Sequence, residues 1–258
     1  MKITKHISFY YLENRILYVN NIIDETNNYE LETDIYIHTN NKNIDETAFN
    51  KYTNGCIKIV YHDLSHINPF YLTWKCRDLL RQQKDEYDIF MYIEDDILVP
   101  YKAIKYWLEY NEKLIKMEYN LGFVRIEVEN NDEYITELEG VKFDTVINLE
   151  DKTYCVNNKS AYCAFWIYNK DEFNKFVNSK YYYINNIDCY YAYMIREKSA
   201  IGLTNVKGWY KNTIIPIINN KLIDNCRIYH MPNNYVTDKT NGFATIKFDE
   251  AINFDVKW

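Results

Sequence analysis

Short apolar runs alternate with helix-like segments along the first hundred residues of the chain. The apolar runs, which predict strands, cover residues 6–11, 34–38, 56–61 and 89–93. Apolar residues at helical spacing predict a helix over 13–23, and Asn68 followed by Pro69 predicts the start of another. This alternation predicts an α/β fold with a mixed, mostly parallel central sheet flanked by helices.

The remainder of the chain mixes the same two patterns. Apolar periodicity predicts a long helix opening at Pro100 and shorter helices over 170–177 and 188–199. Strands are expected at 121–129, with one solvent-facing side, and at 161–168 and 227–230, whereas 203–225 is expected to be loop-rich. Because the chain has no internal repeat and no low-complexity linker, we expect one domain spanning 1–258.

Three acids follow the most hydrophobic of the predicted strands, in the stretch YDIFMYIEDDILVP at 87–100. Carboxylates rarely enter a core unless they are paired or bound to a metal, so Glu94, Asp95 and Asp96 need a reason to be there. Ligands bind at the carboxyl ends of parallel strands, and hard oxygen ligands suit Mg²⁺ or Mn²⁺ together with substrate phosphates. The acids therefore predict a metal-bridged diphosphate. The alternative is that they cap the helix near Pro100, for which one Asp would suffice.

The first hundred residues, with alternating strands and helices that end in an acidic triplet, resemble the GT-A glycosyltransferases. The DxD motif of this family holds a divalent cation on a nucleotide sugar. Glu94-Asp95-Asp96 is similar to the EDD form of that motif. The resemblance implies a Rossmann-like GT-A domain with a nucleotide-binding half, 1–100, and an acceptor-side half, 101–258. It also implies that Asp96 binds the metal directly, while Glu94 and Asp95 lie beside the nucleotide.

Further residues are candidates for donor binding. Arg77, near the start of the helix before the acids, carries a guanidinium that can grip phosphate oxygens or a base in a bidentate way. The resemblance places Thr39 and Asn40, at the end of the second strand, where the family reads the nucleoside. Tyr10, at the end of the first strand, could stack on the base, although in a chain with 27 tyrosines ordinary packing is the alternative.

Residues late in the chain are candidates for metal binding and catalysis. GT-A enzymes often add a C-terminal histidine to the metal shell, and His230 ends a predicted strand in the corresponding region. The alternative is a structural histidine whose polar atoms are satisfied within the fold. An imidazole ligand favours Mn²⁺ over Mg²⁺. Asp188 heads a predicted helix, where inverting GT-A enzymes often carry the base that deprotonates the acceptor, but an N-cap role is the alternative. Glu127, on the expected wet side of its strand, is the second candidate base.

Composition narrows the possible partners and compartments. The net charge of -7 and the pI near 5.4 argue against a nucleic-acid surface. No apolar run approaches the roughly 18 to 20 residues needed to span a bilayer, and the N-terminal stretch lacks the pattern of a signal peptide. The six cysteines show no metal-binding spacing. We therefore expect no membrane anchor and a cytoplasmic location, in the host cytoplasm if the source is viral.

Together these features predict an enzyme of the hexosyl- or N-acetylhexosaminyltransferase class. It would move a sugar from a nucleoside diphosphate, UDP being favoured, to a hydroxyl of a glycan, a protein or another acceptor, with an inverting outcome favoured. One alternative is a nucleotidyltransferase that makes the activated sugar. That chemistry usually brings a glycine-rich phosphate loop near the N-terminus, and the first glycine here is Gly55. The other alternative is a non-catalytic domain that binds a sugar or a protein.

Overall fold

The computed structural model of the chain describes residues 1–183, 194–204, 209–238 and 240–253. The chain divides into two compact units, each described here by itself. Unit 1 consists of 1–97 and 164–207, and unit 2 of 98–163 and 208–258. This division differs from halves at 1–100 and 101–258, because a segment from the second part of the chain returns to complete unit 1.

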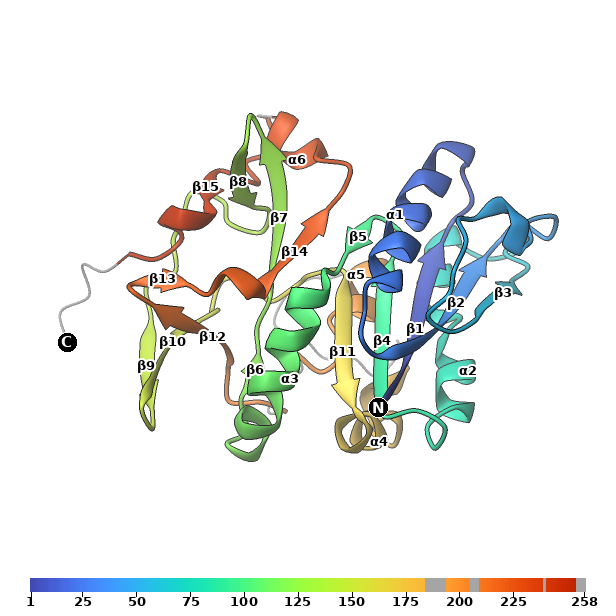
Figure 1. The fold of residues 1–258 in the computed structure, drawn as a ribbon. Helices are drawn as coiled ribbons and strands as arrows, with labels where there is room; N and C mark the ends of the chain where they lie inside the picture. Colours follow the sequence, from blue (N-terminus) through green and yellow to red (C-terminus); the bar gives the residue numbers. More distant parts are fainter. Residues whose placement is uncertain (184–193, 205–208, 239, 254–258) are drawn as a thin grey trace. The chain divides into compact units, whose positions relative to one another are not determined.

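Unit 1 is built on a five-stranded sheet in the order β11-β4-β1-β2-β3 (Figure 1). The pairs β1–β2, β1–β4 and β2–β3 are parallel, and β11 runs antiparallel to β4 at one edge. The strands are β1 (Lys2–Phe9), β2 (Glu32–Thr39), β3 (Ile57–Tyr61), β4 (Ile89–Glu94) and β11 (Phe165–Asn169).

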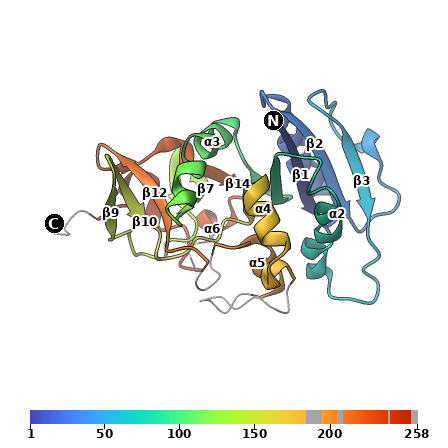
Figure 2. The same ribbon diagram turned by 90° about the horizontal axis from the view of Figure 1, so that it is seen from below.

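Helices cover both faces of this sheet, as the alternating side chains of β1 show. Lys5 points to one face and donates to the Thr26 hydroxyl of α1, whereas His6 points to the other face and contacts Gln83 at the end of α2. Figure 2 shows α2, α4 and α5 of the same unit from below. The helices are η1 (Glu13–Arg15), α1 (Ile16–Asn27), η2 (Glu46–Ala48), η3 (Pro69–Trp74), α2 (Arg77–Gln82), α4 (Lys170–Val177), η4 (Lys180–Tyr182) and α5 (Ile195–Ala200).

Because helices cover both faces of the sheet, β4 is apolar from Ile89 to Ile93 and does not alternate. All of its residues are buried, and Phe90 stacks on Phe173 of α4 with ring centroids 3.9 Å apart. The predicted helix start at Asn68 is confirmed, because its side chain accepts a hydrogen bond from the Phe70 amide at 3.0 Å. The segment that follows begins as a 3₁₀ helix and becomes α-helical at Arg77.

Unit 2 contains two further mixed sheets, each of five strands. One has the order β13-β12-β10-β9 with β6 beside β12, and the other the order β15-β8-β7-β14-β5. The pairs β6–β12 and β7–β14 are parallel, whereas β9–β10, β10–β12, β12–β13, β7–β8 and β8–β15 are antiparallel. The strands are β5 (Ile97–Leu98, where the chain leaves unit 1), β6 (Asn120–Leu121), β7 (Val124–Glu129), β8 (Asp132–Ile135), β9 (Val146–Leu149), β10 (Lys152–Val156), β12 (Thr213–Ile218), β13 (Lys221–Leu222), β14 (Arg227–His230) and β15 (Ile246–Lys247).

The helices described in unit 2 contribute to its core together with the sheets. They are α3 (Tyr101–Lys116), η6 (Asp224–Cys226), α6 (Asn234–Thr237) and η7 (Phe248–Glu250). None of the helices in the described parts of either unit is long and apolar enough to cross a membrane.

The prediction of an α/β chain with mixed sheets and flanking helices is confirmed, but a mostly parallel arrangement does not extend to unit 2. Two local predictions are wrong. Residues 203–225 are not simply loop, because β12 and β13 form there. The strand expected over 121–129 has no wet side at Arg125 and Glu127, since both side chains are buried and bonded to polar groups. Charged and apolar residues alternate there, which indicated exposure, but each charged side chain meets a polar partner from another segment of the fold.

Candidate functional site

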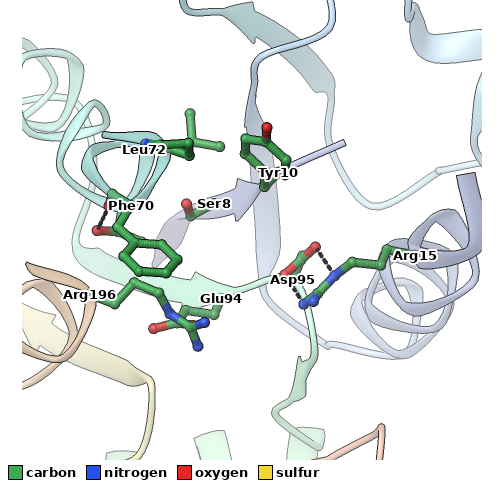
Figure 3. Close-up of a pocket in the computed structure, with 10 residues that line it drawn as sticks. Ser8, Tyr10, Arg15, Phe70, Leu72, Glu94, Asp95 and Arg196 are labelled. Atoms are coloured by element: carbon green, nitrogen blue, oxygen red, sulfur yellow. Dashed lines mark hydrogen bonds and ion pairs between the residues drawn. The ribbon is translucent and has the colours of Figure 1, made fainter. Parts of the chain in front are cut away.

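A cavity of about 290 Å³ lies in unit 1 at the carboxyl ends of β1 and β4 (Figure 3). This is the edge at which parallel α/β sheets bind ligands, and the volume is near the lower limit for small-molecule pockets. The polar lining residues are Ser8, Arg15, Thr73, Glu94, Asp95 and Arg196. The apolar lining residues are Tyr10, Pro69, Phe70 and Leu72.

The acids at the end of β4 point in different directions because side chains alternate along a strand. Glu94 pairs in register with Ser8 of β1, and the Asp95 amide donates to the Ser8 carbonyl at 3.2 Å. Glu94 faces α5, where Arg196 Nη2 donates to its Oε2 at 2.8 Å. Asp95 turns towards Arg15 instead, as Figure 3 shows. The strand ending therefore directs two neighbouring carboxylates to two different arginines.

Arg15 binds both aspartates of the triplet. Its Nε donates to Asp95 Oδ2 at 2.8 Å and its Nη2 to Asp95 Oδ1 at 2.5 Å, which is a bidentate pair. Nη2 also donates to Asp96 Oδ2 at 2.7 Å. Arg15 ends η1, the turn that connects β1 to α1, so its position depends on the same strand edge as the acids.

Carboxyl groups outnumber guanidinium groups at the site. All three acids are at least nine-tenths buried, and two arginines face them. Burial raises the pKa of Asp95 well above its ordinary range, and the neighbouring charge of Asp96 raises it further, while Arg15 opposes the shift. A carboxylate held in this way is stabilised by any additional cation. The charge balance of the site therefore suits a divalent metal.

The donor chemistry of the triplet fits Mg²⁺ or Mn²⁺, but the protein does not complete a coordination shell. Among the residues that the structure describes, no three His, Cys, Asp or Glu side chains come together as a group that could hold a metal ion. Mg²⁺ is usually bound through one or two carboxylates, water and substrate phosphates, without a full protein cage. Asp96 and Asp95 could supply the carboxylates, and the remaining ligands would have to come from a bound anion.

Two aromatic rings stand at the apolar side of the cavity. Tyr10 and Phe70 are 42 % and 50 % exposed, so their rings are accessible at the cavity. The Arg196 guanidinium lies 5.8 Å from the centre of the Phe70 ring. Exposed rings of this kind can stack on a planar ligand such as a nucleobase. The predicted position of Tyr10 at the ligand-binding edge is consistent with this arrangement.

Thr39 and Asn40 lie at the end of β2 but are not among the residues that line this cavity. Thr39 is fully buried, and its hydroxyl accepts from the Asn41 amide at 3.3 Å. The Asn40 side chain accepts from the Tyr11 amide at 2.8 Å. Both side chains thus stabilise the turns that follow β1 and β2, and a direct contact with a nucleoside remains a prediction.

Arg77 is placed differently from the expectation that it grips a phosphate. It is 1 % exposed and does not line the cavity. Its guanidinium lies 4.8–5.2 Å from the ring centres of Trp74, Trp166, Phe176 and Tyr182, and Nη2 donates to the Ser199 carbonyl at 2.9 Å. Helical spacing indicated on which face of α2 the Arg77 side chain lies. That face is covered by segment 164–207, which contains β11, α4 and α5. Arg77 therefore acts as a core residue in this structure.

Glu127 and His230 are joined to each other in unit 2. The His230 Nδ1 atom lies 2.5 Å from Glu127 Oε1, and the Val236 amide donates to Glu127 Oε2 at 2.6 Å. Glu127 has no exposed surface. Its two oxygens are therefore both engaged, which does not suit a general base that must reach an acceptor hydroxyl. Asp96 and His230, the two candidate metal ligands, belong to different units.

Asp188, the first candidate base, lies outside the described residues. Sequence reasoning missed the two arginines at the acids and the exposed ring of Phe70. Arg15 had a usable signal, because it closely follows the end of the first predicted strand, at the sheet edge where ligands bind. Arg196 had none, since only the tertiary fold brings α5 to β4.

Comparisons with known proteins do not extend this description. No protein-family model matches the chain, and no curated protein matches it.

Proposed function

We propose that this protein is a metal-dependent glycosyltransferase of the GT-A type, which transfers a sugar from a nucleoside diphosphate to a hydroxyl. The observation that carries the proposal is the cavity at the ends of β1 and β4, where buried carboxylates, two arginines and two exposed aromatic rings meet. Carboxylates suit a divalent cation, guanidinium groups suit a diphosphate, and aromatic rings suit a base. A nucleoside diphosphate with its metal contains all three partners.

Each kind of side chain at the cavity would bind a different part of the metal–nucleotide ligand. Asp96, with Asp95 beside it, would hold Mn²⁺ or Mg²⁺, which supplies charge neutralisation to the leaving diphosphate when bound. Arg15 and Arg196, which line the same cavity, would bind phosphate oxygens. Tyr10 and Phe70 would stack on the base, UDP being the favoured nucleotide. His230 stays a metal ligand predicted from the sequence, and a neutral ring that donates from Nδ1 to Glu127 keeps its lone pair on Nε2.

The rival proposals differ in the ligand they require. A nucleotidyltransferase acts on a nucleoside triphosphate and usually has a glycine-rich loop after its first strand, but residues 10–15 here contain no glycine. A non-catalytic binding domain needs neither the metal nor the nucleotide. In place of a glycine-rich loop, residues 10–15 carry Tyr10 and Arg15, whose side chains line the cavity. This favours the transferase.

A thermal-shift screen separates these three functions. A transferase should be stabilised by UDP with Mn²⁺, a nucleotidyltransferase by a nucleoside triphosphate with Mg²⁺, and a binding domain by neither. Asp96→Asn removes one anionic ligand while keeping its shape, so the Mn²⁺-dependent part of the UDP shift should disappear with little change in the melting temperature of the unliganded protein. A UDP response that is independent of both Mn²⁺ and Asp96 would contradict the proposal. Release of UDP from UDP-sugars in the presence of Mn²⁺ then identifies the donor.

A further inference from the structure

Arg15 occupies carboxylate oxygens of the kind that a divalent cation would use. It makes two hydrogen bonds to Asp95 and one to Asp96, at 2.5–2.8 Å. These bonds are charge-assisted and lie among groups with little solvent exposure, so they are much stronger than an ion pair at a surface. A cation that approaches the aspartates from solvent must compete with a guanidinium already bound to them.

A guanidinium and a dication cannot share the same carboxylates at low cost. Two like charges a few ångströms apart repel one another strongly where water is scarce. The described residues also assemble no group of three metal-ligating side chains, so the protein alone offers the metal few ligands. A metal without an accompanying anion therefore meets both an incomplete set of ligands and a competing positive charge.

A diphosphate relieves both problems at once. The Arg15 side chain is about a quarter exposed and lines the cavity, so it can turn from the aspartates to a ligand without leaving its turn. Phosphate oxygens accept the same bidentate hydrogen bonds as a carboxylate. The oxygens of Asp95 and Asp96 that Arg15 had bound can then turn to the metal, and the diphosphate supplies further metal ligands.

We propose that Arg15 makes binding of the divalent cation conditional on the presence of a diphosphate. In the unliganded protein Arg15 is the counter-ion of the two aspartates, and the metal binds weakly. The diphosphate takes over the guanidinium, and metal and nucleotide then increase each other's affinity by the same factor. This inference rests on the proposed function and adds to it an order of events governed by one side chain. Arg15 thus binds the aspartates in the absence of the diphosphate and the diphosphate in its presence.

The test measures Mn²⁺ binding directly, from the electron paramagnetic resonance signal of free Mn²⁺, with and without saturating UDP. In the unmodified protein UDP should strengthen Mn²⁺ binding at least tenfold. Arg15→Gln should bind Mn²⁺ alone at least tenfold more tightly than the unmodified protein does. In this variant the ratio of the Mn²⁺ affinities with and without UDP should approach one. Arg15→Lys keeps the charge but loses the bidentate geometry, so binding should remain conditional on UDP. Arg81→Gln, which changes an exposed arginine of α2, should behave like the unmodified protein.

The outcomes distinguish this inference from the proposed function. If UDP binding depends on Mn²⁺ but Arg15→Gln leaves the affinity for Mn²⁺ alone unchanged, the inference is wrong and the transferase proposal stands. Equal Mn²⁺ affinity with and without UDP in the unmodified protein would also overturn it. If neither Mn²⁺ nor UDP binds in any combination, both proposals fail. Because two carboxylates lose their counter-ion in Arg15→Gln, the melting temperature of this variant should also rise more with Mn²⁺ than that of the unmodified protein, which gives a second readout on folded protein.

Discussion

The carboxylate of Glu127 accepts a hydrogen bond from His230 Nδ1 at 2.5 Å, and the same carboxylate accepts from the Val236 amide. Since a carboxylate only accepts, Nδ1 must carry the proton, and the ring orientation is set by a residue on the neighbouring strand. Carboxylate–histidine pairs of this kind commonly fix the ring of a metal-binding histidine. Glu127 therefore has the position of a residue that orients His230, a different role from that of a base.

Glu127→Gln tests this assignment. A glutamine side chain has one acceptor oxygen, so either His230 Nδ1 or the Val236 amide would lose its buried partner, and the free energy of unfolding should fall by about 1–3 kcal/mol. Urea unfolding of the variant measures this loss. Glu129→Gln, two residues along the same strand and less buried, is the control and should lose less. Unchanged stability combined with complete loss of turnover would return Glu127 to the list of candidate bases.

Arg77→Ala should reduce stability and leave donor binding alone. The variant removes a side chain that is packed against four aromatic rings and hydrogen-bonded to the Ser199 carbonyl, so we expect the free energy of unfolding to fall by about 3 kcal/mol or more. Arg81→Ala, one turn along α2 and exposed, should cost less than about 1 kcal/mol. Chemical unfolding and UDP titration of both variants check this. A weaker affinity for UDP in a variant of normal stability would restore the original assignment of Arg77 as a phosphate ligand.

Asp188→Asn addresses the candidate base directly. Asparagine caps a helix as well as aspartate does, so an N-cap role predicts almost no change in stability or activity. Asparagine cannot accept the acceptor's proton, so a base role predicts a collapse of sugar transfer with UDP–Mn²⁺ binding intact. Transfer rates and UDP titrations of the same preparation decide between these results. Near-normal transfer would remove Asp188 from the mechanism and make a retaining outcome as plausible as an inverting one.

A chain of three histidines in unit 1 predicts how stability depends on pH. His6 Nδ1 lies 2.8 Å from His38 Nε2, and His38 Nδ1 lies 2.8 Å from His62 Nε2. Burial lowers the pKa of His6 to about 3 and that of His62 to about 4, and it lowers the pKa of His38 well below its ordinary value. Each N···N contact needs one proton, which neutral rings supply. An added proton at His38 would place two donors against each other.

The sign of the effect follows from these directions. Between pH 7 and 5 the unfolded histidines take up protons near their ordinary pKa of 6.5 while the folded ones remain neutral, so the free energy of unfolding falls as the pH falls. Each fully buried histidine contributes a loss of about 2 kcal/mol over this range. His62→Gln keeps a donor for His38 but removes one titrating ring, and this variant should lose less stability between pH 7 and 5. His66→Gln, an exposed histidine of the same loop, should show the full loss, and urea unfolding at both pH values compares them. Identical pH dependence of the His62 variant and the unmodified protein would contradict this account.

The local features of the fold could be predicted from the sequence, because they depend on neighbouring residues. The helix over 170–177 is observed at those residues, with Asn169 and Glu172 forming a capping box, and the helix expected from Pro100 begins at Tyr101. The apolar run before the acids forms β4, and the acids lie at its carboxyl end beside a cavity. Hydrophobic periodicity and cap residues act within one or two turns of chain, so they can be recognised without knowledge of the fold.

The tertiary structure alone decided which charged groups meet and which become core. Arg15 and Asp95 are 80 residues apart in the chain, and Arg196 and Glu94 are 102 apart, so their pairing depends on the order of the strands and on the returning segment. The same segment buries Arg77, and the pairing of β7 with β14 connects Glu127 to His230. The position of a charged residue in a helical or strand pattern is the same whether its side chain contacts water, an aromatic ring or an opposite charge. Only long-range packing determines which of these it meets, because the cost of burying a charge depends on the groups that surround it.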